Sequence, residues 1–261
     1  MRRFTALYLA VFILLIPVVL TGCAQQEKNG LEKVKSSGEI SFAMSGGYPP
    51  FNYFNTKNEL VGFDVDVAKE VAKRLGVTLK PVTTEWSGII EGLRSGIYNG
   101  ILGSMAATEE RKKVVDFSTP YYYSGAQIFV RSNAPFKSAD ELKDKAVGLV
   151  TGTTFEQDAK SLGVSDIRLY KDDTHTLTEL SSGVIDGVVT DRVVGINAMN
   201  SGKFKIKPLG SPLRKEDIAV AFRKEDKTLK DAVNKILKQM HEDGTLSKLS
   251  KKWLKVDITR K

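Results

Sequence analysis

The chain has 261 residues, of which 41% are hydrophobic and 27% are charged, and its formal net charge is +8. This length suits one large domain or two of roughly 100–150 residues each, and the composition argues against a disordered chain. The lysines are scattered along helical segments rather than clustered with aromatic residues. The charge therefore indicates a generally basic secreted protein and argues against a nucleic-acid partner.

The N-terminus has the layout of a secretory signal peptide, in which two arginines precede an apolar run and a small-residue cleavage site comes directly before Cys23. This end resembles the bacterial lipobox, in which the cysteine receives the lipid and becomes the new N-terminus. We therefore expect removal of residues 1–22, lipidation of Cys23 by a diacylglycerol and an acyl chain such as palmitate, and a polar tether over 23–37. The alternative is an uncleaved membrane anchor, since residues 4–20 are about long enough to span a bilayer.

The rest of the chain alternates strand and helix patterns. Apolar residues recur at helical spacing over 64–75, and Gly76 then ends the pattern. In chain order we predict strand 38–44, helix 64–75, strand 77–82, helix 86–94, strand 97–102, a capping box at Ser138 and Glu141, strand 146–150, helix 155–162, strand 167–170, helix 176–182, strand 184–190 and helix 192–200. This alternation favours parallel sheets with helices on both faces.

One sequence pattern occurs twice. The frame L-x-S-G-[IV]-x-[ND]-G-[IV]-[LV] begins at Leu93 and again at Leu180, and it describes a helix end, a glycine stop and a buried strand. We interpret the pair as two lobes of similar topology, although two unrelated helix–glycine–strand junctions are the alternative. Ser104 and Asp191 then occupy matching positions at the carboxyl ends of strands, where ligands bind in open parallel sheets.

Arg111 stands at an unusual position for an arginine. Thr108 is a predicted helix N-cap, and a capping box would place Glu or Gln three residues later, where this chain has Arg111. The first turn of a helix also disfavours a cation, because this end of the helix dipole is positive. We therefore expect Arg111 to face a negative group outside its own helix.

Three further elements lead into the same predicted cleft. Thr153 and Thr154 open a helix after Gly152, and the amides of such a helix start attract an anion. Asp191 follows a strand of the second lobe, and Tyr48 follows the first strand of the chain. An arginine and a helix start would hold a carboxylate, and Asp191 would hold a cation. These groups beside aromatic residues fit a free α-amino acid as the ligand.

The residue inventory argues against an enzyme or a metal site. Neither of the two histidines, His175 and His241, belongs to a cluster with metal-ligand spacing, and the one cysteine lies at the expected anchor. We therefore predict a binding protein with no catalytic residue, metal or cofactor.

Several motifs occur in a definite order along the chain: YPPF at 48–51, LVGFDVD at 60–66, TEER at 108–111, VDFSTPYY at 115–122, GTT at 152–154, Asp186 with Asp191, and DGT…KKW within 243–253. With this order and spacing, the chain from about Gly38 onward resembles the polar amino-acid family of extracellular solute-binding proteins that feed ABC importers.

The resemblance implies a type II periplasmic-binding-protein-like α/β fold of two lobes, each a mostly parallel sheet flanked by helices. Lobe 1 would comprise residues 38–122 and 221–261, and lobe 2 residues 123–220. Two crossover strands, 122–131 and 217–222, would form the hinge. The resemblance also implies an extracytoplasmic monomer that binds a free amino acid and docks on a membrane permease of the ABC type.

The resemblance also implies roles for individual residues. Arg111 would bind the ligand carboxylate and Asp191 its α-ammonium, while Thr154 and the amide of Ser104 would contact the ligand backbone groups. Tyr48 and Trp86 would pack on the ligand side chain. The whole predicted ligand-binding set is Arg111, Asp191, Ser104, Thr154, Thr153, Tyr48, Trp86, Ala106 and Phe155. Ala106 departs from the family pattern, because a hydroxyl is common there.

The ligand class is predicted from the absence of charge at six candidate pocket positions: Ser45, Tyr48, Trp86, Ala106, Val150 and Phe155. Burying an unpaired ligand charge costs several kcal/mol, so this set favours a neutral ligand such as cystine, glutamine or an apolar amino acid. A basic amino acid stays open if Glu85 reaches the cleft. A small-carboxylate dehydratase of the same fold also stays open, with Glu156 as the candidate acid. Asp64 and Asp66 are interpreted as helix caps only.

Overall fold

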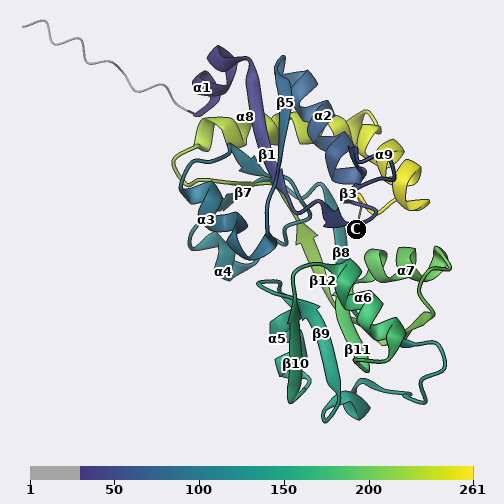
Figure 1. Cartoon of the computed structure of the whole chain (residues 1–261). Helices are drawn as coiled ribbons and strands as arrows, with labels where there is room; N and C mark the ends of the chain where they lie inside the picture. The colour runs from purple at the N-terminus through teal and green to yellow at the C-terminus, as the bar shows by residue number, and fades with distance from the viewer. Residues whose placement is uncertain (1–29, 261) are drawn as a thin grey trace, which may run out of the picture.

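The computed structural model describes residues 30–260, which form two lobes joined by long strands (Figure 1). We call lobe 1 the part built on the sheet β5 (Thr78–Thr83), β1 (Glu39–Met44), β6 (Gly100–Ile101), β13 (Ala221–Phe222) and β7 (Asp116–Phe117). We call lobe 2 the part built on β10 (Asp166–Tyr170), β9 (Ala146–Val150), β11 (Gly187–Asp191), β8 (Tyr122–Arg131) and β12 (Ile206–Ile218). A small antiparallel sheet adds β2 (Gly47–Tyr48), β3 (Asn52–Phe54) and β4 (Leu60–Val61) to lobe 1.

Helices cover both sheets, as the strand–helix alternation predicts (Figure 1). Lobe 1 carries α1 (Gly30–Ser37), α2 (Phe63–Leu75), the 3-10 turn η1 (Trp86–Gly88), α3 (Ile89–Arg94), α4 (Glu109–Lys112), α8 (Lys227–Glu242) and α9 (Thr245–Leu254). Lobe 2 carries η2 (Ala139–Leu142), α5 (Phe155–Ser161), α6 (Asp173–Ser182) and α7 (Arg192–Asn200). The predicted capping box at Ser138 and Glu141 is present at the start of η2.

The two lobes repeat one strand order, which confirms the interpretation of the repeated sequence pattern. In lobe 1, β1 lies between β5 and β6 and is parallel to both; in lobe 2, β9 lies in the same way between β10 and β11. The next strand is antiparallel in each sheet. The repeated segments lead into β6 and β11, so Ser104 and Asp191 follow or end equivalent strands.

Two strands run between the lobes (Figure 1). β8 has the bounds expected for the first crossover, and it pairs antiparallel with β12 over most of its length. The second crossover, predicted at 217–222, comprises the end of β12, two linking residues and β13. The polypeptide thus passes from one sheet to the other along paired strands, a geometry that suits a hinge.

The predicted polar tether is wrong over residues 30–37, which form helix α1. Val34 of this helix is 1% exposed and belongs to the lobe 1 core, and α1 packs on α8. The apolar contact of Val34 gives this segment a fixed place on the lobe. The expected signal peptide, Cys23 and the first part of the tether lie outside the described residues.

Other element boundaries also differ from the prediction. The strand predicted over 97–102 shortens to β6, because Ile97 is 67% exposed and lies outside the sheet. The helix predicted over 176–182 starts earlier, at Asp173, because the side chain of Asp172 accepts a hydrogen bond from the amide of His175 and caps it.

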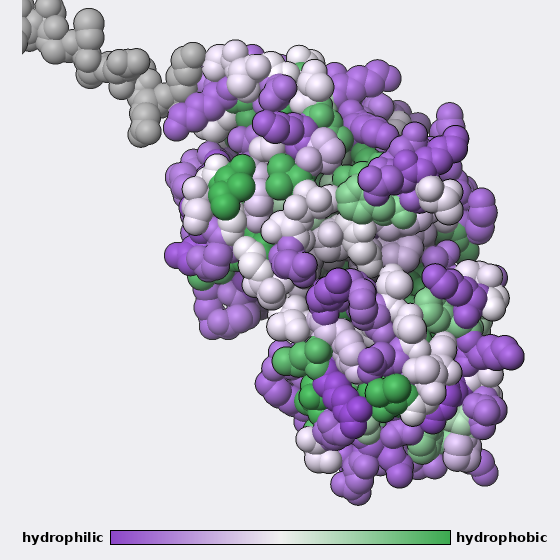
Figure 2. Space-filling view, viewed as in Figure 1, coloured by the Kyte–Doolittle hydropathy of each residue, from purple (hydrophilic) through white to green (hydrophobic). Residues whose placement is uncertain are grey.

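The lobe 1 core lies between α2, α8 and the sheet. Val67 and Val71 of α2 meet Leu229 and Val233 of α8 together with Phe42 of β1, and all five are fully buried. Burial of each such side chain contributes about 1.5–3 kcal/mol. Figure 2 shows that hydrophilic residues cover most of the visible face, with hydrophobic ones in small separate spots. The large apolar side chains are therefore buried mainly inside the lobes.

Replacement of Gly195 by alanine is expected to destabilise lobe 2. Gly195 of α7 packs against the buried ring of Phe129 in β8, and an added Cβ would lie 2.0 Å from a ring carbon. Overpacking of this kind costs about 1–3 kcal/mol. Urea denaturation of Gly195→Ala should show this loss, whereas Gly88→Ala, where a Cβ meets open space, serves as the control. Equal stability of the two variants would contradict the packing argument.

Candidate functional site

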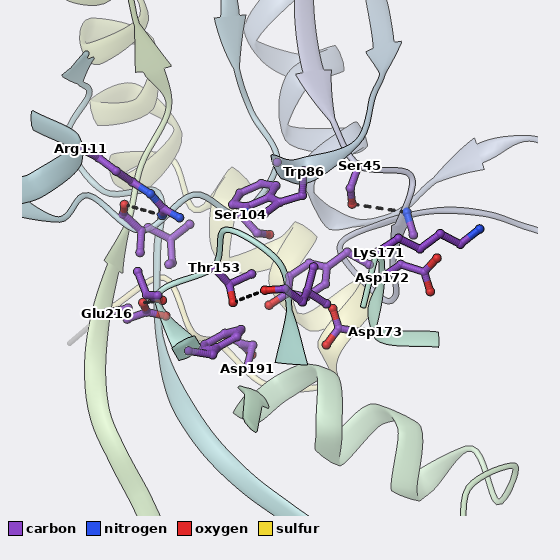
Figure 3. Close-up of a pocket in the computed structure, with 18 residues that line it drawn as sticks. Ser45, Trp86, Ser104, Arg111, Thr153, Lys171, Asp172, Asp173, Asp191 and Glu216 are labelled. Carbon is purple, nitrogen blue, oxygen red and sulfur yellow. Dashed lines mark hydrogen bonds between the residues drawn. The ribbon is translucent and has the colours of Figure 1, made fainter. Parts of the chain in front are cut away.

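A pocket lies between the lobes and encloses about 540 Å³ of empty space, part of it continuous with solvent (Figure 3). All nine residues of the predicted ligand-binding set line it, as do Ser45 and Val150. Segments far apart in the sequence thus meet here, because the carboxyl ends of equivalent strands in the two lobes face each other.

Arg111 reaches from α4 of lobe 1 to lobe 2. Its Nη1 donates to the Ala106 carbonyl at 3.1 Å and its Nη2 to the Gly152 carbonyl at 3.2 Å, and the guanidinium lies 5.6 Å from the centre of the Trp86 ring. Burial lowers the pKa of Arg111. Among residues 30–260, no carboxylate forms an ion pair with this guanidinium. The site therefore contains a desolvated cation that is held by carbonyl groups and an aromatic face.

Asp191 ends β11 on the lobe 2 side of the pocket and is 2% exposed. Its Oδ1 accepts from the Val193 amide at 2.7 Å and from the Val194 amide at 3.4 Å, so it caps α7. Burial raises the pKa of Asp191 to about 7, and the nearby charge of Glu216 adds to the rise. A cation beside this carboxylate would relieve the cost of its burial.

Ser104 is held by a buried network within lobe 1. Its backbone has a φ of 65°, the left-handed region that non-glycine residues rarely adopt. Its hydroxyl donates to Asp64 at 2.8 Å, and its amide donates at 3.1 Å to the hydroxyl of Tyr121, which in turn donates to Asp64 at 2.7 Å. Both donor groups of Ser104 are thus engaged within lobe 1, including the amide expected to contact a ligand.

Asp64 is the hub of this network, and its interpretation as a helix cap is wrong. The N-cap of α2 is Gly62, and Asp64 makes no cap hydrogen bond. Asp64 also accepts from Asn52 at 2.7 Å, and the Asn52 amide oxygen accepts from the Gly46 amide at 2.9 Å. One buried carboxylate therefore ties both lobe 1 pocket loops together. Burial raises the pKa of Asp64 to about 6.

Asp66 is likewise not a cap. Its Oδ2 accepts from the indole nitrogen of Trp253 at 2.8 Å and from the Lys252 ammonium at 2.6 Å. This carboxylate therefore fastens α9 to α2, two helices that lie far apart in the sequence.

The turn after β9 brings Thr153 and Thr154 to the pocket. Gly152 has a φ of 76° and allows the tight turn there. The amide of Thr153 donates to the Val150 carbonyl, and the Thr154 hydroxyl donates to Glu216 at 2.7 Å instead of capping α5. The Thr153 amide is therefore already hydrogen-bonded within the turn. Fewer amides of this helix start can bind a ligand anion than the sequence predicts.

Apolar and aromatic groups complete the walls. Tyr48 stacks on Phe51 with ring centres 5.5 Å apart, and burial together with Asp191, Asp173 and other acids raises its pKa well above the ordinary value. Ala106 and Phe155 are each 5% exposed and belong to the lobe cores as well. These side chains form the apolar and aromatic part of the lining.

Sequence reasoning missed four charged residues of the pocket: Lys171, Asp172, Asp173 and Glu216. The first three directly follow β10, so the strand-end rule that singled out Ser104 and Asp191 could have found them. Glu216 lies within crossover strand β12, for which the sequence carries no such signal. The six uncharged positions are thus only part of the lining, and the argument for a neutral ligand loses its basis. Glu85 does not line the pocket.

Three further features concern the enzyme alternative, metal binding and membrane spans. Glu156, the candidate acid of the enzyme alternative, pairs with Lys160 at 2.7 Å and does not line the pocket. Within residues 30–260, no three His, Cys, Asp or Glu side chains are grouped so that they could hold a metal ion. No helix in the same range is both long and apolar enough for a membrane span.

Comparisons with known proteins agree with the fold. The sequence profile of the bacterial extracellular solute-binding proteins, family 3, matches residues 40–256. The L-cystine-binding protein TcyJ of Escherichia coli (strain K12) is 36% identical over 234 residues, which cover 88% of each chain.

Two solved structures resemble the whole fold. A mutant of ArgBP from T. maritima superposes with a TM-score of 0.83 at 32% identity, covering 87% of this chain and 99% of that one. The ancestral amino acid-binding protein AncCDT-1, a precursor of cyclohexadienyl dehydratase, superposes with a TM-score of 0.81 at 35% identity, covering 86% and 99%.

The fold and the inter-lobe pocket define a solute-binding protein of the two-lobed, type II class. The chain belongs to the bacterial extracellular solute-binding proteins, family 3.

Proposed function

We propose that this protein captures a free L-amino acid between its lobes and delivers it to an ABC importer. The observation that carries the proposal is the half-buried Arg111 guanidinium, which lines the pocket without an ion-pair partner among the described residues. A ligand carboxylate is the group that pairs best with a guanidinium, since both can form two parallel hydrogen bonds.

The second half of the ligand head would meet Asp191. A zwitterion placed between Arg111 of lobe 1 and Asp191 of lobe 2 offers each buried charge its opposite. Such a ligand contacts both lobes at once, so it stabilises the closed form relative to the open one. The closed form would then dock on the permease. Tyr48 and Trp86 would pack on the ligand side chain.

The sequence and the relatives support the proposed cellular setting. Lipidation at Cys23 would hold the protein outside the cytoplasm on the membrane that contains the permease. Relatives named as amino-acid binders, such as TcyJ, support the ligand class. AncCDT-1, as a dehydratase precursor, shows why turnover must be measured together with binding.

The test is a ligand screen on the full chain. Thermal shift and calorimetry against the twenty amino acids and cystine should find at least one ligand that raises the unfolding temperature, since a ligand at 100 times its Kd stabilises by about 2.7 kcal/mol. The proposal fails if no α-amino acid binds. It also fails as a transport function if a prephenate-like acid is converted to product while amino acids leave the protein unaffected.

A further inference from the structure

Asp173 is a buried acid of the pocket to which the proposed amino-acid head assigns no role. It is 5% exposed, begins α6 in lobe 2 and lines the cavity. The hydroxyl of Thr190 donates to its Oδ1. No lysine, arginine or histidine between residues 30 and 260 forms an ion pair with it, and none contributes to its titration.

The other acids of the pocket have an arginine, a histidine ring or a proposed ligand group as partner. Glu216 pairs with Arg214 at 2.7 Å, and Asp172 contacts His175 at 2.8 Å. Asp191 is assigned to the α-ammonium of the ligand. Asp173 therefore remains as a desolvated carboxylate whose described partners are the Thr190 hydroxyl and its own backbone amide, a costly arrangement in the absence of a cation. The burial of Asp173 and the charge of Asp172 raise the pKa of Asp173 to about 7. This rise has the same cause as the unfavourable free energy of the buried carboxylate.

The position of Asp173 places it away from the expected ligand carboxylate. Figure 3 shows Arg111 and Asp173 on opposite sides of the pocket, with Trp86 and Asp191 between them. A ligand whose carboxylate meets Arg111 and whose α-ammonium meets Asp191 would extend its side chain toward Asp173. Asp173 and Gly47 line both this pocket and a neighbouring groove, whose wall also includes Pro49.

We propose that Asp173 binds a second cationic nitrogen of the ligand, so that the preferred ligands are α-amino acids with an additional ammonium or guanidinium group. This inference rests on the proposed function and names its ligand class. For a basic amino acid the charge balance supports it, because Arg111 and Asp191 neutralise the head of the ligand and Asp173 neutralises its far end. In cystine, Asp173 would pair with the second ammonium only. Two ligand types share this chemistry, namely basic amino acids and symmetrical diamino acids such as cystine.

Calorimetry at pH 8 on the full-length protein in detergent tests the assignment with matched ligands. Arginine is compared with citrulline, which has the same shape without the charge. Cystine is compared with S-methylthio-cysteine, which keeps the disulfide and one amino-acid head. In one pair, we expect at least tenfold higher affinity for the member that carries the additional cationic nitrogen, which is arginine or cystine. The pair that shows this difference identifies the ligand type.

The Asp173→Asn variant should lose this preference while it binds the neutral member within about threefold of the wild-type affinity. Asp166→Asn, which removes a surface acid of β10 that pairs with Arg168 outside the pocket, should keep the preference. The inference is overturned if wild type binds both members of both pairs equally well, or if the preference persists in Asp173→Asn. If no α-amino acid binds at all, the proposed function fails and this inference fails with it, whereas neutral binding without preference refutes this inference alone.

Discussion

Arg111→Ala is expected to abolish most amino-acid binding while the free protein stays folded. Loss of one partner of a buried, hydrogen-bonded charge pair costs about 2–5 kcal/mol, which corresponds to a loss of affinity of roughly 30-fold or more. The variant also removes the only described contact of the guanidinium with lobe 2, its hydrogen bond to the Gly152 carbonyl. Both effects weaken the closed, ligand-bound form more than the fold of either lobe.

Two further variants sharpen this prediction. Arg111→Lys keeps the charge but loses the planar fork, so its affinity should lie between those of wild type and Arg111→Ala. Lys112→Ala removes a cation from the same helix, where it pairs with Glu109 on the surface, and should leave binding unchanged. Calorimetry with the ligand found in the screen gives all three affinities. Wild-type affinity in Arg111→Ala would rule out the assigned carboxylate contact.

Asp191→Asn is expected to change binding and stability in opposite directions. The amide cannot neutralise an ammonium, so affinity should fall by an amount similar to that in Arg111→Ala. Asparagine still caps a helix about as well as aspartate, so α7 keeps its N-terminal hydrogen bonds. Removal of a desolvated charge should make the ligand-free protein at pH 8 more stable than wild type, as measured by urea denaturation.

The titration of the Asp191 carboxyl makes the free energy of unfolding depend on pH. The pKa of Asp191 is raised from 3.8 to about 7, chiefly by burial, so the folded chain binds more protons than the unfolded chain between these values. The contribution of this carboxyl to the free energy of unfolding therefore falls as pH rises from about 4 to 7. Asp173 and Asp64 act in the same direction, and Glu216 and Tyr48 lie close to Asp191.

Asp191→Asn should consequently show a smaller fall in stability over that interval than wild type. Ligand binding shows the mirror effect, because an ammonium favours the ionised carboxylate. Affinity should rise with pH up to about 7, and binding at lower pH should release protons, which calorimetry in buffers of different ionisation enthalpy detects. Identical stability profiles of wild type and variant would contradict the assignment of Asp191 as a titrating pocket group.

The sequence by itself indicated the two-lobed α/β plan and nine of the 18 residues that line the pocket. The lobes and the strand-end residues depend on local signals: apolar spacing, glycine stops and the rule that ligands bind at the carboxyl ends of strands. Three of the nine depend instead on the resemblance to the family: Trp86, Ala106 and Phe155. The repeated pattern at Leu93 and Leu180 added the symmetry that brings Ser104 and Asp191 to one pocket. Arg111 could be singled out because its conflict with the helix dipole is visible in one turn of sequence.

Only the tertiary structure decided the charge of the pocket and the support of its loops. Glu216 comes from a crossover strand, whose pocket-facing side depends on how the lobes are placed. Asp64 follows a glycine at a helix start and looks like a cap, but its partners Asn52, Ser104 and Tyr121 lie 12, 40 and 57 residues away. The sequence pattern reports neighbours along the chain, whereas the cost of burying a carboxylate is set by neighbours in space.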